Sequence, residues 1–124
     1  MRILLIDDEP DTTERLALYL GHDGHAVESL CWVDGEATFR DLLVDFRPDG
    51  VVLDFEMEPG GPQILAWLRA FSDTLPVAFY TKYGASPAHI HRMIEAGVGE
   101  GDIVTKREAA EDTRRLLAVL GRRS

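Results

Sequence analysis

Acidic residues follow two of the most apolar stretches of the chain, and their side chains are the first candidates for chemistry. Asp54 comes directly after three apolar residues, and the chain breaks soon afterwards at a Pro-Gly-Gly sequence. Asp7 and Asp8 follow the apolar run 3–6 in the same way. Open α/β sheets bind ligands beyond the carboxyl ends of their strands, where the direction of winding reverses. We therefore expect Asp7, Asp8 and Asp54 to share one crevice.

The chemistry expected of this crevice is the binding of a metal and of a phosphoryl group. Converging carboxylates repel one another, which raises their pKa values unless a cation neutralises them. Hard oxygen ligands with room for water suit Mg²⁺. Thr81 and Lys106 end two later apolar runs and offer a hydroxyl and an ammonium group. Such a set suits a phosphoryl group on Asp54, because a carboxylate can form an aspartyl-phosphate and its transfer needs mainly positioning and charge neutralisation.

Strand-like and helix-like segments alternate five times along the chain. The expected strands are 3–6, 25–29, 51–54, 77–80 and 102–105. Between and after them, apolar side chains recur at helical spacing. These helical faces consist of Thr13, Leu16, Ala17 and Leu20; Phe39, Leu42, Leu43 and Phe46; Ile64, Leu65, Leu68 and Phe71; Ile90, Met93, Ile94 and Gly97; and Ala109, Thr113, Leu116, Leu117 and Leu120. Unbroken apolar strands are expected when helices cover both faces of a parallel sheet.

The alternation predicts an α/β fold, a doubly wound five-stranded parallel sheet with helices on both faces. Right-handed crossovers leave few topologies. Among them, the flavodoxin-like order 2-1-3-4-5 places the first and third strands side by side at the reversal point, which brings Asp7 and Asp8 next to Asp54. The second strand is less apolar than its neighbours and is expected nearer an edge. No internal linker divides the sequence, so residues 1–124 are expected to form a single domain.

Capping and stop residues predict the helix ends. Asp11 with Glu14 has the spacing of a capping box at the start of the first helix, and Gly21 is expected to end that helix. Asp34 is expected to cap the second helix, and Ser86, which precedes a proline, the fourth.

Composition limits the classes of function. With 124 residues and 45% hydrophobic content, the chain can bury a real core, and no apolar run reaches membrane-spanning length or forms a signal peptide. The single cysteine, Cys31, excludes an internal disulfide framework and is expected to be a small, half-buried hydrophobe. The net charge of −9 opposes direct binding to nucleic acid. We expect a cytoplasmic domain without membrane contact, whose partners are proteins or metal cations.

The order of the polar residues resembles the response-regulator receiver domain of two-component signalling. Asp7-Asp8, Asp54, Thr81 and Lys106 each end an expected strand in the right order, and the similarity spans essentially the whole chain. The resemblance implies that Asp54 accepts a phosphoryl group from a sensor histidine kinase or phosphotransfer protein. Lys106 would pair with a phosphoryl oxygen, and Thr81 would hydrogen-bond the phosphate after transfer.

The resemblance also implies a metal site and a mode of action. The side chains of Asp8 and Asp54, with the backbone carbonyl of Glu56, would bind Mg²⁺, and Asp7 would act largely through the water shell of the ion. The phosphorylated domain would present a changed surface to a downstream protein target. It would lose its phosphoryl group slowly and would not be a turnover enzyme.

Several positions depart from the family pattern. The proline that usually follows the lysine is Arg107, which leaves the isomer of the Lys106–Arg107 bond open, since a non-proline cis bond costs about 2.5–4 kcal/mol. The aromatic switch position in the last strand is Ile103, so its usual coupling to the threonine is expected to be absent or altered. Lys82 replaces a small residue, and its side chain either shields the phosphoryl group or points into solvent. The loop that contains residues 57–59 is one residue longer than usual.

Two other classes of function compete with the phospho-accepting receiver domain. One is a phosphorylation-independent, receiver-like interaction module, which the changes at Lys82, Ile103 and Arg107 favour. The other is a metal-dependent phosphohydrolase similar to the haloacid-dehalogenase-like family. That family usually has a second aspartate two residues after the nucleophile, where this chain has Glu56, and no cap domain is evident. We therefore expect no steady turnover of phosphate esters.

Basic and histidine-rich segments outside the crevice suggest less specific roles. His89 and His91 face different directions on one helix, so a shared metal is not expected. The pairs Arg114–Arg115 and Arg122–Arg123 solvate the last helix and favour its negative end, and they are compatible with a homodimer face formed with the fourth helix. The sequence leaves open whether the domain acts alone or is part of a larger protein.

Overall fold

The computed structural model describes residues 1–57 and 60–123. Glu58 and Pro59, in the loop expected to be longer than usual, lie outside them. The strands are β1 (Arg2–Ile6), β2 (Ala26–Leu30), β3 (Gly50–Leu53), β4 (Val77–Thr81) and β5 (Ile103–Thr105). The helices are α1 (Pro10–His22), α2 (Glu36–Phe46), α3 (Gly61–Phe71), α4 (Pro87–Glu95) and α5 (Ala109–Arg123), and a short 3-10 helix (Glu100–Asp102) precedes β5.

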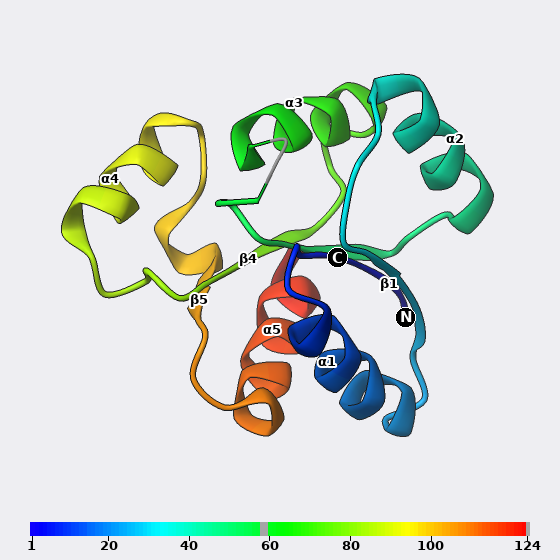
Figure 1. The fold of residues 1–124 in the computed structure, drawn as a ribbon, viewed down its shortest axis with the longest axis horizontal. Helices are drawn as coiled ribbons and strands as arrows, with labels where there is room; N and C mark the ends of the chain where they lie inside the picture. Colours follow the sequence, from blue (N-terminus) through cyan, green and yellow to red (C-terminus); the bar gives the residue numbers. More distant parts are fainter. Residues whose placement is uncertain (58–59, 124) are drawn as a thin grey trace.

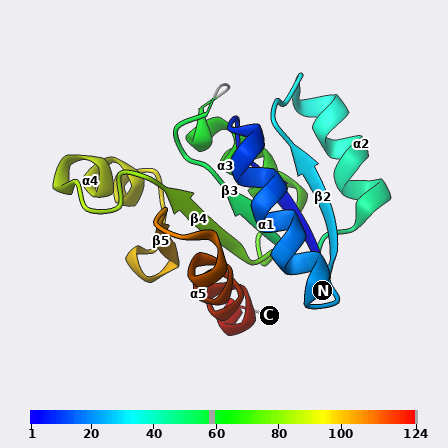
Figure 2. The same cartoon turned by 60° about the horizontal axis from the view of Figure 1, so that its bottom comes forward.

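The strands form one parallel sheet in the order β2-β1-β3-β4-β5, which confirms the predicted topology. In Figure 1, α1 and α5 lie on one face of the sheet, and α2, α3 and α4 lie on the other. Figure 2 shows α1 and α5 crossing the sheet side by side. At the end of β1, Ile6 pairs with Leu30 of β2 on one side and with Leu53 of β3 on the other. The carboxyl ends of β1 and β3 therefore meet at the point where the winding reverses.

The central strands are buried on both faces because helices cover both. In β1, Leu4 and Ile6 belong to the core on the side of α2 and α3, and Ile3 and Leu5 belong to the core on the side of α1 and α5. Each such side chain contributes roughly 1.5–3 kcal/mol when it is fully buried. The second strand, by contrast, is an edge strand with mostly exposed or half-buried residues, as its composition predicted. The core therefore fixes the strands that carry the acidic residues.

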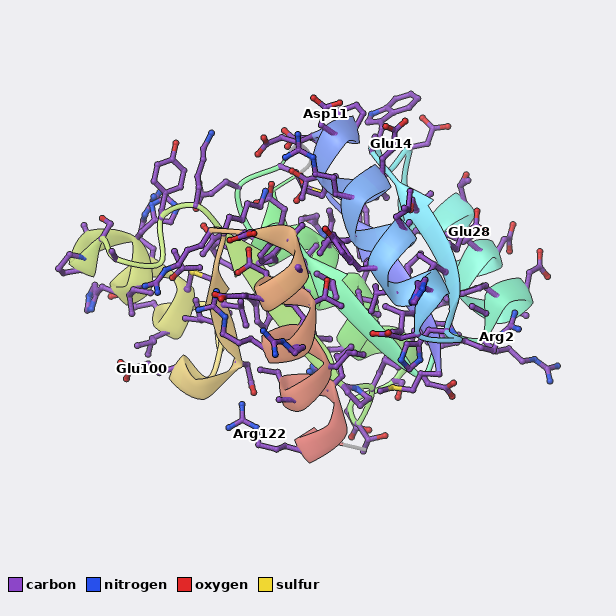
Figure 3. The ribbon with its side chains drawn as sticks, turned by 90° about the horizontal axis from the view of Figure 1, so that it is seen from below. Arg2, Asp11, Glu14, Glu28, Glu100 and Arg122 are labelled. Carbon is purple, nitrogen blue, oxygen red and sulfur yellow. The ribbon has the colours of Figure 1, made fainter. Side chains whose placement is uncertain are left out.

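The first helix begins earlier than its capping signal predicted. Pro10 is its first residue and Glu9 occupies the N-cap position, without a capping hydrogen bond from its side chain. The predicted capping box of Asp11 and Glu14 is therefore wrong, and both side chains are exposed at the start of α1 (Figure 3). Pro10 explains the shift, because its fixed φ angle and missing N–H suit the first helical position.

Two further helix ends differ from their predictions. Asp34 does not cap α2, because Gly35 lies between it and the first turn in an extended conformation. Gly21 does not end α1, which continues to His22, and the chain turns at Gly24, where φ is 89°. Ser86 does occupy the N-cap position of α4, but its side chain makes no capping hydrogen bond.

Four residues that were expected to be at least partly buried lie at the surface, and one of them, Gly97, also lies beyond Glu95, the last residue of α4. Phe71, the last residue of α3, is 37% exposed, and Ile94 of α4 is 44% exposed. Cys31, directly after the edge strand β2, is also exposed rather than half-buried. Helical spacing identifies a face, but it does not show where the neighbouring elements stop covering that face.

Two glycines allow close approach of the loops that surround the carboxyl ends of the strands. A Cβ atom at Gly61 would lie 2.4 Å from the carbonyl oxygen of Phe55, to which the Gly61 N–H donates at 2.8 Å. A Cβ atom at Gly84 would lie 2.0 Å from Oγ1 of Thr105. These contacts require glycine at both positions and hold the loops after β3 and β4 against the sheet.

Candidate functional site

Four carboxylates gather where β1 and β3 end. Asp7, Asp8, Glu9 and Asp54 each offer an oxygen, and these oxygens all lie within 4.8 Å of one another. Asp7 and Asp54 are 4% and 6% exposed, whereas Asp8 and Glu9 are exposed. The structure thus brings together the three aspartates that the strand order predicted. It adds Glu9, which sequence analysis missed although it directly follows the acidic pair.

Backbone amides orient three of the site's side chains in the same manner. Asp7 Oδ1 accepts the N–H of Glu9 at 2.9 Å, and Asp54 Oδ1 accepts the N–H of Glu56 at 3.0 Å. On the next strand, Thr81 Oγ1 accepts the N–H of Tyr83 at 3.1 Å. Each acceptor is thus paired with the amide two residues downstream, the pattern of Asx and ST turns. Because one oxygen of each aspartate is held this way, the other oxygen is presented to the site.

Lys106 lies across from the carboxylates. Its Nζ atom is 2.7 Å from Asp7 Oδ2, 3.1 Å from Glu9 Oε1 and 3.5 Å from Asp54 Oδ2. Its backbone N–H donates to the carbonyl oxygen of Thr81 at 2.8 Å, which ties the end of β5 to the end of β4. The ammonium group therefore contacts the acidic cluster from the end of β5, as the sequence predicted.

The clustering shifts several pKa values. Burial raises the pKa of Asp7 to about 6, although Lys106 and the N–H of Glu9 oppose the rise. Partial burial and the charge of Asp54 raise the pKa of Asp8, whereas the hydrogen bond from Lys106 lowers that of Glu9. Burial lowers the pKa of Lys106, but the acidic partners of the ammonium group raise that pKa by more, so the net shift is upward. A bound cation would relieve the cost of keeping these buried carboxylates ionised.

The donor set fits a hard divalent cation. Carboxylate and carbonyl oxygens are the ligands that Mg²⁺ takes in proteins. Asp7 Oδ2 is buried and, within the part of the chain that the structure describes, receives no hydrogen bond of good geometry, only the ion pair with Lys106. An acceptor that is buried and incompletely paired is costly unless something else occupies it. The cluster therefore has the ligand type that a metal site needs, and a buried carboxylate oxygen whose contact with Lys106 is an ion pair rather than a well-aligned hydrogen bond.

A cavity of about 340 Å³ opens beside these groups. It is lined by Asp8, Glu9, Asp54, Glu56, Thr81, Lys82, Tyr83 and Lys106. Thr81 is fully buried, whereas Lys82 is exposed, with Nζ 5.5 Å from the centre of the Tyr83 ring. Ile103 is not part of this lining, because it packs against the apolar core on the side of α2 and α3. The cavity is large enough for a small anion that contacts Thr81 and Lys106 together.

A second group of polar contacts joins the cavity to α4. His89, which is 8% exposed, contacts the Glu56 carboxylate through Nε2, and its Nδ1 accepts a hydrogen bond from the Arg92 guanidinium at 2.7 Å. Its ring lies 4.4 Å from the ring of Tyr83. His91 is exposed and pairs with Glu95 instead, so the two histidines face different directions as predicted. No residue pattern predicted the contact of His89 with Glu56, which joins α4 to the loop after β3.

Comparison with known proteins agrees with this architecture. The model of the response regulator receiver domain family matches residues 3–118. Response regulator MprA of Mycolicibacterium vanbaalenii is 32% identical over 125 residues, which cover 100% of this chain and 52% of the relative. Response regulator MprA of Mycobacterium bovis is 30% identical with the same coverage. The chain thus spans about half the length of the curated relatives it matches.

Solved structures show the same fold at low sequence identity. The chemotaxis response regulator CheY4 of Vibrio cholerae superposes with a TM-score of 0.77 at 17% identity, covering 96% of this chain and 97% of that protein. The beryllofluoride-activated NtrC4 receiver domain dimer gives a TM-score of 0.75 at 19% identity, covering 99% and 98%. Because the model of the response regulator receiver domain family matches residues 3–118, the chain belongs to that family. It is the receiver domain of a two-component response regulator.

None of the described helices is both long enough and apolar enough to cross a membrane.

Proposed function

We propose that this domain accepts a phosphoryl group on Asp54 from a sensor histidine kinase or phosphotransfer protein. The observation that carries the proposal is the position of Asp54 Oδ2. Its partner oxygen, Oδ1, is held by the N–H of Glu56, whereas Oδ2 lies at the cavity, 3.5 Å from the ammonium of Lys106. In the transfer, a lone pair of Oδ2 forms the new bond to phosphorus as the bond between phosphorus and its donor atom breaks.

The chain's own residues would stabilise the transferred group in two ways. Lys106 would neutralise charge on one phosphoryl oxygen, which is where positioned cations contribute most to such transfers. Thr81 would donate its hydroxyl proton to another phosphoryl oxygen. The same hydroxyl oxygen would still accept the N–H of Tyr83. Neither side chain needs to leave its strand end for these contacts, because both already line the cavity.

Mg²⁺ is the cofactor we propose for the site. Asp8, Asp54 and the backbone carbonyl of Glu56 would hold it directly, and Asp7 would contact its water shell through Oδ2. When bound, the ion supplies positive charge to the phosphoryl oxygens and to the clustered carboxylates. This assignment is supported by the close spacing of the acidic oxygens and by the incompletely paired Asp7 Oδ2.

The domain would act as a switch rather than as a turnover enzyme. In the phosphorylated form it would contact a downstream protein target differently, and it would lose the phosphoryl group slowly by attack of water. We also propose that it works in the cytoplasm, where its kinase partner would supply the phosphoryl group. A phosphorylation-independent interaction module remains the second candidate, because Ile103 lies outside the cavity and Arg107 replaces the family's proline.

Labelling with acetyl phosphate separates these two candidates. Incubation with acetyl phosphate and Mg²⁺ should yield a singly phosphorylated protein by intact mass, and chelation of Mg²⁺ should prevent it. Asp54→Asn should remain unlabelled, whereas Asp45→Asn, at an exposed position of α2, should label like the unmodified protein. Absence of labelling in the unmodified protein under all conditions would favour the phosphorylation-independent module.

A further inference from the structure

A fully buried carboxylate lies beside the site but outside its cavity. Asp112, in the first turn of α5, is 0% exposed. Its Oδ2 accepts the hydroxyl of Tyr80 at 2.5 Å and the backbone N–H of Arg107 at 2.8 Å, and its Oδ1 contacts the guanidinium of Arg115. A buried carboxylate is tolerated when donors satisfy both of its oxygens, and here they come from three separate elements.

Two of the three donors to Asp112 are neighbours of site residues in the sequence. Tyr80 immediately precedes Thr81, and Arg107 immediately follows Lys106. Asp112 therefore holds the residue before Thr81 and the residue after Lys106. Thr81 and Lys106 are also joined directly, because the N–H of Lys106 donates to the carbonyl of Thr81. The backbone that carries the ammonium group is thus held at two consecutive amides.

Tyr80 also contacts the lysine side chain itself. The Nζ atom of Lys106 lies 5.4 Å from the centre of the Tyr80 ring, within the range of a cation–π interaction. The same ring is 4% exposed and packs in the core between the sheet and α1 and α5. Its hydroxyl is fixed by Asp112, and burial together with that hydrogen bond raises the pKa of Tyr80, so the hydroxyl stays a donor.

The residue at position 107 makes this arrangement specific to the chain. A proline there has no N–H and would leave Asp112 Oδ2 with one donor fewer. Arg107 supplies that donor through its backbone, so the anchor depends on the departure from the family pattern. The hydrogen bond from this N–H to Asp112 fixes the direction in which the chain leaves β5. In the family pattern, the proline ring restricts that direction instead.

We propose that Tyr80 and Asp112 are positioning residues that hold the Lys106 ammonium at the phosphoryl site. Tyr80 acts on the side chain through its ring and on the backbone through Asp112, and Asp112 acts through the N–H of Arg107. The role of these residues in phosphoryl binding rests on the function proposed above, whereas their effect on the place of Lys106 in the resting protein does not. The two parts are tested separately.

The first test observes the lysine in the metal-free protein. The chain contains two lysines, so selective ¹³C labelling of lysine gives two sets of Cε signals, and Lys82→Arg assigns them. Tyr80→Phe, which keeps the ring and removes only the hydroxyl, should shift the Lys106 signal. Tyr19→Phe, which alters a 45% exposed tyrosine on α1, should leave it in place. An unchanged Lys106 signal in both Tyr80→Phe and Asp112→Asn would overturn the proposal.

The second test measures binding of beryllofluoride, a mimic of the phosphoryl group, at saturating Mg²⁺. Tyr80→Phe should weaken beryllofluoride binding about fivefold, since small displacements of a positioned group cost up to about a hundredfold. The dissociation constant for Mg²⁺ alone should change less than that for beryllofluoride, because Lys106 would contact the phosphoryl mimic directly and reaches the metal site only through Asp7 and Asp54. A purely structural role would alter both constants equally or neither.

A double-mutant cycle decides whether Tyr80 acts through the lysine. Lys106→Met removes the ammonium, and in that background Tyr80→Phe should have no further effect on beryllofluoride affinity. Losses that simply add would overturn the proposal. If the unmodified protein fails to bind beryllofluoride, the proposed function fails, and the lysine signal in the metal-free protein still decides whether Tyr80 and Asp112 position Lys106.

Discussion

Two buried acidic groups lie on either side of Lys106, and they differ in how completely they are paired. In the Asp112 cluster, defined by Asp112 with Tyr80, Arg107 and Arg115, both carboxylate oxygens have donors. In the acidic site, Asp7 Oδ2 is buried and forms an ion pair with Lys106 but, among the described residues, no hydrogen bond of good geometry. The first arrangement has a donor for each carboxylate oxygen, whereas in the second, one ammonium group faces three carboxylates. Pairing, rather than burial, therefore distinguishes a supporting carboxylate from a ligand-binding one.

The largest expected difference between the two regions is in labelling. Asp54→Asn should abolish phosphorylation by acetyl phosphate, because the amide has no nucleophilic oxygen of comparable charge. Asp112→Asn should still be phosphorylated, although more slowly, because it acts only through the position of Lys106. Time courses by intact mass measure both, and equal loss of labelling in the two variants would contradict the distinction.

Removal of the completely paired carboxylate should cost the most stability. Asp112→Ala leaves the buried Tyr80 hydroxyl without its acceptor and removes the partner of the Arg107 N–H, so we expect a loss of about 3 kcal/mol in the free energy of unfolding. Urea denaturation measures this loss. Asp45→Ala, at an exposed position of α2, is the control and should change stability by no more than about 0.5 kcal/mol. A loss for Asp112→Ala as small as that of the control would mean that the cluster contributes nothing to the fold.

Removal of the Asp7 carboxylate should instead increase the free energy of unfolding of the metal-free protein. The folded-state pKa of Asp7 is raised to about 6, so ionisation of Asp7 destabilises the fold as the pH rises from about 4 through 6. Asp7→Asn should therefore increase the free energy of unfolding by about 1–2 kcal/mol at pH 7.5, after allowance for the lost ion pair with Lys106. Below pH 4 the gain should vanish, because the aspartate is then protonated in both states.

Magnesium provides the counter-test for Asp7. Saturating Mg²⁺ should stabilise the unmodified protein more than Asp7→Asn, and this should reduce or reverse the gain at pH 7.5. Thermal or urea unfolding with and without Mg²⁺ measures the effect. An Asp7→Asn variant that is less stable than the unmodified protein in chelator would show that the buried oxygen is adequately paired without a metal.

The smallest expected effect concerns the exposed lysine at the rim of the cavity. If the Lys82 side chain shields the phosphoryl group, Lys82→Ala should increase the rate of phosphoryl loss about twofold, since water would reach phosphorus more easily. The decay of the phosphorylated protein, followed by intact mass, measures this rate. An unchanged rate would show that the side chain points into solvent, and its place over the Tyr83 ring would then be only a surface contact.

The acidic site could be predicted from the sequence because it depends on one rule that acts along the whole chain. Parallel strands present their carboxyl ends at one edge, so Asp7, Asp8 and Asp54 had to converge once the strand order was known. The helix ends were predicted less well, since capping preference is weak beside the fixed backbone of Pro10 or the extended Gly35. Local signals of this kind compete with one another, whereas the sheet order does not.

The Asp112 cluster could not be predicted for a different reason. In the last helix, Asp112 lies three residues after Ala109 and four before Leu116, so helical spacing places it on the same face as the apolar residues but does not show what pairs its charge. Its burial depends on a tyrosine of β4 and on a backbone N–H after β5, and neither contact leaves a trace in the spacing of residues. Arg122 is similar, because its guanidinium reaches the carbonyl of Gly101, close to the labelled Glu100 in Figure 3.

The repeated pairing of a side chain with the amide two residues downstream has a thermodynamic consequence. Asp7, Asp54 and Thr81 each lose rotational freedom when the protein folds, so little of that freedom remains to be lost when an ion or anion arrives. The entropic cost of an ordered coordination sphere is thus met at the moment of folding. Binding at this edge of the sheet should consequently show a small conformational-entropy penalty, and its enthalpy should come mainly from exchange of water for oxygen ligands.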